Sequence, residues 1–198
     1  MPTLRVLTEQ EVKTLIDLPT AWSAIESAYG EHGRTPEIQS RPPVMTIAGP
    51  RPTLGRAVLG QYRIKGASVP CVAAAGAFMA TRDHPYMYLW SAETDAPMGL
   101  IACDWLSQFR VAVTAAVCVD RLARSNIRKI ALFGAGKYAT QACSLLAQRW
   151  PDAQLHLVAA HLASAERLAA AMPRPVFASG LISADRTILL KWWLEAVS

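Results

Sequence analysis

Hydrophobic and polar positions follow two different patterns along the chain, and the change falls near Asn126. Before it, segments with helical spacing are mixed with strand-like runs. After it, apolar strands and amphipathic helices alternate regularly, which is typical of a parallel sheet. We therefore predict an α/β protein with two domains, residues 1–125 and residues 126–198.

The first domain is predicted to mix helices and strands. Helical spacing covers residues 7–16, 19–33 and 104–124, and strand-like runs cover 57–69, 85–93 and 98–103. Thr8 and Glu11 have the spacing of a capping box, which satisfies free amides at a helix start. Gly30 and Gly33 are expected to end the second helix. The Pro- and Arg-rich region 35–53 predicts a loop or an irregular edge strand.

The second domain follows a βαβαβ pattern. Strands are expected at residues 129–134, 153–160 and 175–179, and helices at 137–150 and 163–172. This pattern is one half of the doubly wound sheet that binds dinucleotides. We therefore predict a partial Rossmann-type parallel sheet.

A glycine turn joins the first strand and helix of this second domain. It fits the dinucleotide fingerprint G-x-G-x-x-A, in which the first glycine permits a tight turn and the second permits close approach to a pyrophosphate. The helix amides and dipole then favour the phosphates. The expected cofactor-binding residues are Gly134, Ala135, Gly136, Lys137, Tyr138 and Ala139. The alternative is a plain strand-to-helix turn without a ligand.

An acidic residue that would hold the ribose hydroxyls of NAD is missing after the second strand. That position in the fingerprint is occupied here by Ala159, Ala160 and His161. The cofactor is therefore NAD or NADP, with NADP slightly favoured because its additional phosphate excludes a nearby carboxylate. His161 and Arg167 are candidate contacts for that phosphate.

The composition is globular, with 52% hydrophobic and 18% charged residues. The net charge of +5 suits an anionic ligand or an ordinary basic surface, and the scattered Lys and Arg do not predict a nucleic-acid partner. No segment approaches the ~20 apolar residues of a membrane span, and the N-terminus does not resemble a signal peptide. A cytoplasmic protein without a membrane partner is expected. The four cysteines lack disulfide or metal-site spacing and are expected to be reduced core thiols.

Several segments occur in the order and spacing of one known family. They include "YRIKGASVP", "SAETDAPMGLIACDWLSQFRVAVTAA" and "IALFGAGKYATQA". On these motifs the chain resembles the ornithine cyclodeaminase/mu-crystallin family from Thr8 to about Ala171. The resemblance implies an N-terminal α/β domain that forms homodimers and contributes substrate contacts. It also implies a Rossmann-type domain that carries NAD or NADP.

The same resemblance implies a chemistry and a set of substrate residues. Family members cyclodeaminate ornithine or lysine, reduce cyclic ketimines or deaminate alanine oxidatively, always with hydride transfer at an amino-acid α-carbon through an imine. Lys65 resembles the lysine that contacts the substrate carboxylate and polarises the reacting centre. Arg110 resembles the arginine that clamps the carboxylate, and Arg41 resembles a second carboxylate-binding arginine. For each of the three, the alternative is a solvated surface cation.

The chain also departs from the family pattern. Val111 follows Arg110 in place of the usual Thr, Tyr138 replaces a Gln, and Asp95 stands where a turn glycine is expected. The residues from Arg128 to Ser198 leave room for only one half of a Rossmann domain. The resemblance therefore predicts a divergent, C-terminally truncated member that retains the fold but whose own catalysis is in question.

Two function classes follow from these patterns. The first is an NAD(P)-dependent oxidoreductase or cyclodeaminase that acts on an amino acid or its imine, with Lys65 and Arg110 as catalytic residues. The second is a non-catalytic protein that binds NAD(P) or a related ligand, and an inert fragment is a third possibility. The sequence does not separate them.

Overall fold

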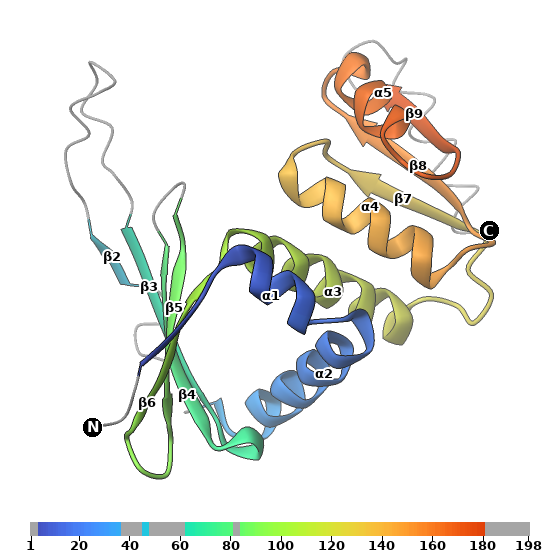
Figure 1. Ribbon diagram of the computed structural model, residues 1–198. Helices are drawn as coiled ribbons and strands as arrows, with labels where there is room; N and C mark the ends of the chain where they lie inside the picture. The colour runs from blue at the N-terminus through green and yellow to red at the C-terminus, as the bar shows by residue number, and fades with distance from the viewer. Residues whose placement is uncertain (1–3, 37–44, 48–61, 81–83, 181–198) are drawn as a thin grey trace, which may run out of the picture. The chain divides into compact units, whose positions relative to one another are not determined.

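The computed structural model describes residues 4–36, 45–47, 62–80 and 84–180 (Figure 1). The chain forms two units, Met1–Ser107 and Gln108–Ser198. This boundary lies inside a long helix, whereas the change of sequence pattern suggested a boundary near Asn126. The predicted α/β class is confirmed, because one sheet is mixed and the other is parallel.

The first unit is built on a six-stranded sheet with the order β1-β6-β5-β4-β3-β2. Only β1 runs parallel to its neighbour, β6, and the remaining neighbours are antiparallel. The strands are β1 (Arg5–Leu7), β2 (Met45–Ile47), β3 (Tyr62–Val69), β4 (Ala74–Ala80), β5 (Tyr86–Ser91) and β6 (Pro97–Ala102). A short 3₁₀ turn, η3 (Pro70–Val72), joins β3 and β4.

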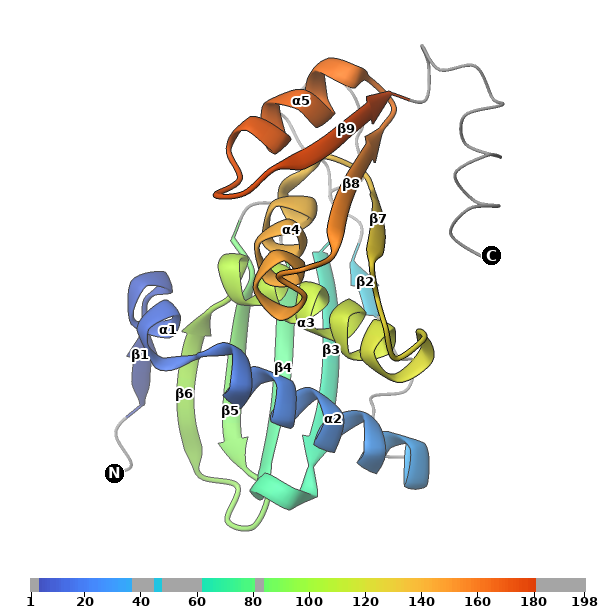
Figure 2. The same ribbon diagram turned by 90° about the vertical axis from the view of Figure 1, so that its right-hand side faces the viewer.

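Helices α1 (Glu9–Leu15) and α2 (Leu18–Arg34) lie on the same face of this sheet (Figures 1 and 2). The predicted capping box is present, since Thr8 and Glu11 exchange side-chain and backbone hydrogen bonds at the start of α1. Of the two glycines predicted to end the second helix, Gly30 lies inside α2, whereas Gly33 is one residue before its last residue, Arg34. Each glycine inside a helix costs only about 1 kcal/mol relative to alanine, so other interactions of α2 outweigh it.

A carboxylate distant in sequence caps the long helix α3 (Asp104–Leu122). The Glu9 oxygens accept hydrogen bonds from the backbone amides of Asp104, at 2.5 Å, and Trp105, at 3.0 Å. Glu9 is also the first residue of α1. One side chain therefore ties the starts of two helices together, and its negative charge suits the positive end of α3.

Strand register divides the sheet residues between two faces. One face carries the cross-strand row Met45, Ile64, Met79, Tyr86 and Ala102, and the parallel row Gly66, Ala77, Tyr88, Leu100 and Val6. The other face carries the row Lys65, Phe78, Met87, Ile101 and Leu7. The large hydrophobic side chains that these strands expose, including Met45, Met79 and Tyr86, all belong to the first face. We infer that α1 and α2 pack on the second face, where Lys65 stays exposed.

The second unit contains the parallel sheet that the sequence predicts. Its order is β7-β8-β9, with all neighbours parallel. The elements after α3 are β7 (Lys129–Phe133), α4 (Lys137–Arg149), β8 (Gln154–Ala159), α5 (Leu162–Ala170) and β9 (Val176–Gly180). Leu155 and Leu157 on the central strand are fully buried, α4 packs on β7 and β8, and α5 packs on β8 and β9.

Two cationic side chains form hydrogen bonds at the carboxyl end of α4. Arg149 donates to Asp120 of α3 at 2.6 Å, in a pair that is partly exposed. Arg174 donates to the carbonyl oxygens of Trp150, Pro151 and Ala153, at 3.2, 2.5 and 2.7 Å. These carbonyls follow the carboxyl end of α4, where helix carbonyls lack partners within the helix. Arg174 therefore holds the turn between α4 and β8.

Candidate functional site

The glycine turn follows the carboxyl end of β7. Gly134 has a φ of +110°, a conformation that side chains other than glycine rarely adopt. Its amide donates to the carbonyl oxygen of Val158 on β8 at 2.8 Å. The turn is thus fixed to the neighbouring parallel strand, at the edge of the sheet where α/β proteins bind ligands.

Gly136 is the N-cap of α4 and brings no side chain to the helix start. The first turn of α4 contains no acidic residue either. By contrast, Thr8 caps α1, Asp17 caps α2 and Glu9 caps α3. An uncapped helix start combines unpaired amide donors with a partial positive charge, and this combination favours a bound anion.

The turn also leaves room for a ligand beside its backbone. A Cβ atom added at Gly134 or at Gly136 would meet no other atom within 4 Å. Ala139, in contrast, is only 7% exposed and its small side chain packs inside the unit. Two of the three small residues therefore leave space outside the backbone, and the third permits close packing, while their role in cofactor binding stays a prediction. The residues present fit a dinucleotide pyrophosphate.

Lys137 and Tyr138 form the exposed part of the first turn of α4. The Lys137 Nζ lies 5.9 Å from the centroid of the Tyr138 ring, within the range of a cation–π interaction. The Tyr138 side chain is 45% exposed. The Lys137 charge is unfavourable at the positive end of α4, and a phosphate bound there would make it favourable.

The carboxyl end of β8 lies next to this turn and carries no acid. Ala159 is buried, Ala160 is exposed, and His161 is the N-cap of α5 without a capping side-chain hydrogen bond. Arg167 is in the last turn of α5, away from that end. Gly180, at the end of β9, fits against α5 so closely that a Cβ there would come within 2.8 Å of the Leu162 backbone nitrogen.

The predicted substrate residues belong to different parts of the chain. Lys65 is an exposed residue of β3 in the first unit, directly opposite Phe78 on β4. Arg110 is an exposed residue of α3 and belongs to the second unit, as does the glycine turn. Arg41 lies outside the described residues. Their roles as carboxylate ligands stay predictions.

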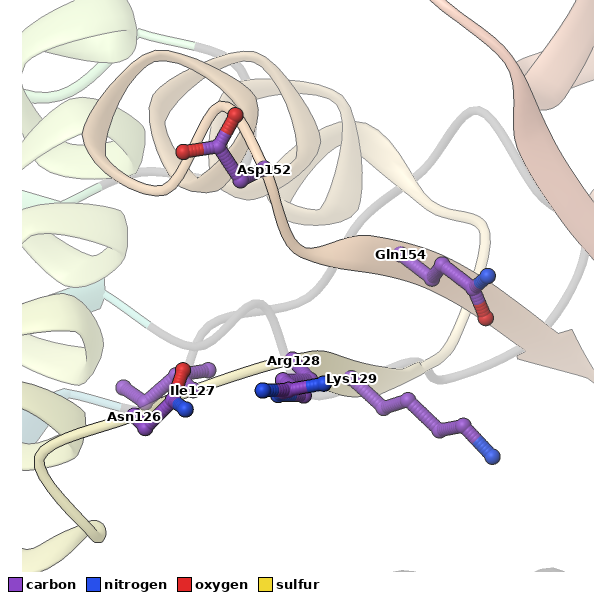
Figure 3. Close-up of a pocket in the computed structure, with 6 residues that line it drawn as sticks. All are labelled: Asn126, Ile127, Arg128, Lys129, Asp152 and Gln154. Carbon is purple, nitrogen blue, oxygen red and sulfur yellow. The ribbon is translucent and has the colours of Figure 1, made fainter.

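The described part of the second unit also has a shallow pocket at the amino ends of β7 and β8 (Figure 3). Its volume is about 450 Å³, and its lining consists of Asn126, Ile127, Arg128, Lys129, Asp152 and Gln154. The glycine turn lies at the other end of these parallel strands. The pocket is therefore not the cofactor site.

The expectation of core thiols is confirmed for two cysteines and wrong for two. All four are free, and Cys103 and Cys143 are buried while Cys71 and Cys118 are exposed. Burial, together with the Glu9 carboxylate, raises the pKa of Cys103 to about 12, and burial raises the pKa of Cys143 to about 11. Among the described residues, no cluster of His, Cys, Asp or Glu could hold a metal ion.

Two residues near the candidate sites were not singled out from the sequence. The Val158 carbonyl, which fixes Gly134, could not be recognised without the strand order. Arg63 lies two residues before Lys65 on β3, and the spacing in "YRIK" was the only sequence signal that they share a face.

None of the described helices has the length and apolar character needed to cross a bilayer.

Comparison with known proteins identifies similar solved structures. No family model and no curated protein matches the chain. The iminosuccinate reductase of Paracoccus denitrificans in complex with NAD⁺ matches with a TM-score of 0.72 and 19% identity, over 89% of this chain and 56% of that one. A probable ornithine cyclodeaminase from Bordetella pertussis Tohama I matches with a TM-score of 0.67 and 17% identity, over 88% and 55% of the two chains.

A third match is the Δ¹-pyrroline-2-carboxylate reductase of Thermococcus litoralis in complex with NADH and L-proline. Its TM-score is 0.68 and its identity 14%, over 91% of this chain and 58% of that one. The chain thus spans about half the length of the solved structures it matches. The fold is that of ornithine cyclodeaminase-like proteins, as the sequence resemblance predicted.

Proposed function

We propose that this protein is an NAD(P)-dependent oxidoreductase or cyclodeaminase that acts on an amino acid or its imine. The observation that carries the proposal is the start of α4, where no side chain caps the helix and two glycines leave open space. Solved structures with the same fold support it, since one is a complex with NAD⁺ and another is a complex with NADH.

The protein's contribution to cofactor binding comes from backbone groups. Gly134 turns the chain sharply after β7, and Gly136 brings the first amides of α4 to the pyrophosphate. Lys137 adds a positive charge in the same turn. When bound, the nicotinamide supplies a hydride donor or acceptor, and the chain holds and orients it.

NADP is the preferred form of the cofactor in this proposal. A carboxylate at the end of β8 would repel the 2′-phosphate, and Ala159, Ala160 and His161 provide none. His161 at the start of α5 is a better candidate contact than Arg167, because Arg167 is in the last turn of that helix. The 2′-phosphate would then meet a histidine and a second helix start that lacks an acidic residue.

Lys65 and Arg110 bind the substrate carboxylate in this proposal, and Arg41 is a further candidate ligand. The planar Arg110 guanidinium can hold a carboxylate through two parallel hydrogen bonds, whereas the Lys65 ammonium acts as a compact point charge. Fixing the carboxylate fixes the attached α-carbon, where a hydride leaves an amine or is added to an imine. Positioning of this kind reduces the entropic part of the barrier.

The protein is also proposed to form a homodimer through the first unit. The face of the six-stranded sheet with Met45, Met79, Tyr86 and Val6 is apolar, and these side chains are between 41% and 58% exposed. Its strand positions carry no charge, so a second copy could meet the same face without like-charge repulsion. Lys65 is exposed on the opposite face, so this interface would not bury it.

A binding titration followed by a turnover assay tests the proposal. NADPH and NADH are titrated by fluorescence, and turnover is then measured with ornithine, alanine and cyclic ketimines. We expect NADPH to bind at least as tightly as NADH and one substrate class to turn over. Lys65→Gln and Arg110→Gln should reduce turnover at least ten-fold and leave cofactor binding unchanged, because their charges act on the substrate.

Three outcomes would count against this function. If a folded sample binds neither nucleotide, the proposed cofactor site is wrong. If the protein binds a nucleotide but turns over none of the substrates, it is a nucleotide-binding protein and the proposed enzymatic activity is wrong. Loss of nucleotide binding in Lys65→Gln would show that its role has been misassigned.

A further inference from the structure

All charged residues in the described strands of the six-stranded sheet are cations on one face. They are Arg5 on β1 and Arg63 and Lys65 on β3, and these strands contain no aspartate or glutamate. The register places the three on the same face, because Arg5 pairs with Gly99 in the row that reaches Ala67, and Ala67 alternates with Lys65 and Arg63. The strand charges on this face are therefore all positive, and two of the three are on β3.

Arg63 and Lys65 stand side by side on that face. Residues two apart in a strand point the same way, and their Cα atoms are about 7 Å apart. Both residues are exposed. Two long cationic side chains at this separation can contact two anionic groups of one small molecule at the same time.

The positions opposite the pair on β4 are apolar. Arg63 is opposite Ala80, and Lys65 is opposite Phe78, on β4. Ala67, the next residue of β3 on this face, is also small. The two cations thus flank an apolar ring and two methyl groups, which suits a short carbon chain with an anion at each end.

We propose that Arg63 binds a second anionic group of the substrate, so that the preferred substrate is a dicarboxylic amino acid or its imine. This inference rests on the proposed function, in which Lys65 binds the α-carboxylate. Arg63 then acts as a specificity-determining residue: it contacts the far end of the substrate, and the carbon chain lies between the two cations.

Binding of two simple anions tests this inference. Glutarate is butyrate with a second carboxylate at the far end of the chain, so the pair isolates the contribution of that group. Both are titrated against the full chain at constant ionic strength, by calorimetry. We expect glutarate to bind at least ten-fold more tightly than butyrate. Arg63→Gln should reduce this ratio to less than two-fold and leave butyrate binding unchanged, and Arg63→Lys should retain part of it.

Arg5→Gln is the matched control. Arg5 lies on the same face and carries the same charge, but it is four strands away from β3, or about 19 Å. It should leave the ratio unchanged, whereas Lys65→Gln should weaken both anions. Circular dichroism and thermal unfolding of each variant show whether it folds as the parent does.

The possible failures are distinguishable. Equal binding of glutarate and butyrate, or a ratio that Arg63→Gln does not change, overturns the inference and leaves the proposed function intact. An equal effect of Arg5→Gln and Arg63→Gln also overturns it, because the preference would then come from overall charge. Binding of neither anion by the folded protein overturns both the inference and the carboxylate role of Lys65.

Discussion

His156 shows how a single residue on the central strand of the second unit responds to its surroundings. Its side chain is 7% exposed and stacks on Phe177, with ring centroids 4.6 Å apart and an angle of 15° between the rings. Burial, assisted by the Lys129 charge, lowers the pKa of His156 below its ordinary value of 6.5. The folded state therefore favours the neutral imidazole.

The stability of the protein should fall as the pH decreases below about 6.5. The unfolded chain binds a proton at His156 before the folded chain does, so the stabilisation is complete above the ordinary pKa and is lost as the pH falls. His156→Gln cannot titrate and should lose less stability between pH 7 and pH 5. Thermal unfolding over this range measures the difference. Parallel curves for parent and variant would show that His156 does not govern this pH dependence.

Glu9 links two helices, α1 and α3. Its carboxylate receives two backbone amides at the start of α3, and its own helix begins at the same residue. A bond between residues so distant in sequence cannot be recognised from a local pattern. The bond depends on the tertiary contact between α1 and β6, the strand that precedes α3.

Glu9→Ala should lower the free energy of unfolding by about 1–2 kcal/mol, because two amides at a partly buried helix start lose a charged acceptor. Chemical denaturation measures this change. Glu166→Ala, at an exposed position of α5, is the control and should have an effect below about 0.5 kcal/mol. Equal effects of the two substitutions would mean that the Glu9 bonds do not stabilise α3.

Local pattern predicts some elements of this fold well and misses others. The helices α3 and α4 and the strands β7 and β8 have strong periodicity, and they form where it predicts. Strand β4, "AAGAFMA", was not predicted, because alanine and glycine have low strand propensity. Pairing with β3 on one side and β5 on the other decides its structure.

In the candidate site, too, the sequence predicts some features and misses others. The glycine turn is local, so its residues and its strand–turn–helix setting could be predicted from the sequence. The bond from Gly134 to Val158 and the shared face of Arg63 and Lys65 depend on strand order and register, which no short motif contains. Asp95 shows the limit of residue type as a guide, since it adopts a φ of +56° where the family resemblance led us to expect glycine.

The two faces of the six-stranded sheet have different tasks in the proposed molecule. The face with Lys65 and Arg63 carries all the charges of the described strands, and the face with Met79 and Tyr86 carries none. A dimer that uses the uncharged face would leave the exposed Lys65 and Arg63 side chains outside the interface. The separation also allows each role to be tested without the other.

Met79→Lys should convert the proposed dimer to a monomer. It places a charge among side chains that a second copy would bury, and an unpaired buried charge is strongly unfavourable. Sedimentation velocity measures the change. Ala67→Lys adds the same charge on the opposite face and should leave the dimer intact. A monomeric parent protein, or an unchanged dimer in Met79→Lys, would contradict this interface.

The central claim is that the turn before α4 holds a dinucleotide, and Gly136→Ala tests it most directly. Gly136 has a φ of −87°, which alanine adopts freely, and its Cβ would meet no protein atom within 4 Å. Gly33→Ala, on α2, also adds a methyl group in open space and is the matched control. The measurement is the Kd for NADPH of both variants, with thermal unfolding as the check on folding. We expect Gly136→Ala to remain folded and to bind NADPH at least ten-fold more weakly, while Gly33→Ala binds as the parent does. Unchanged NADPH binding by a folded Gly136→Ala would contradict the account.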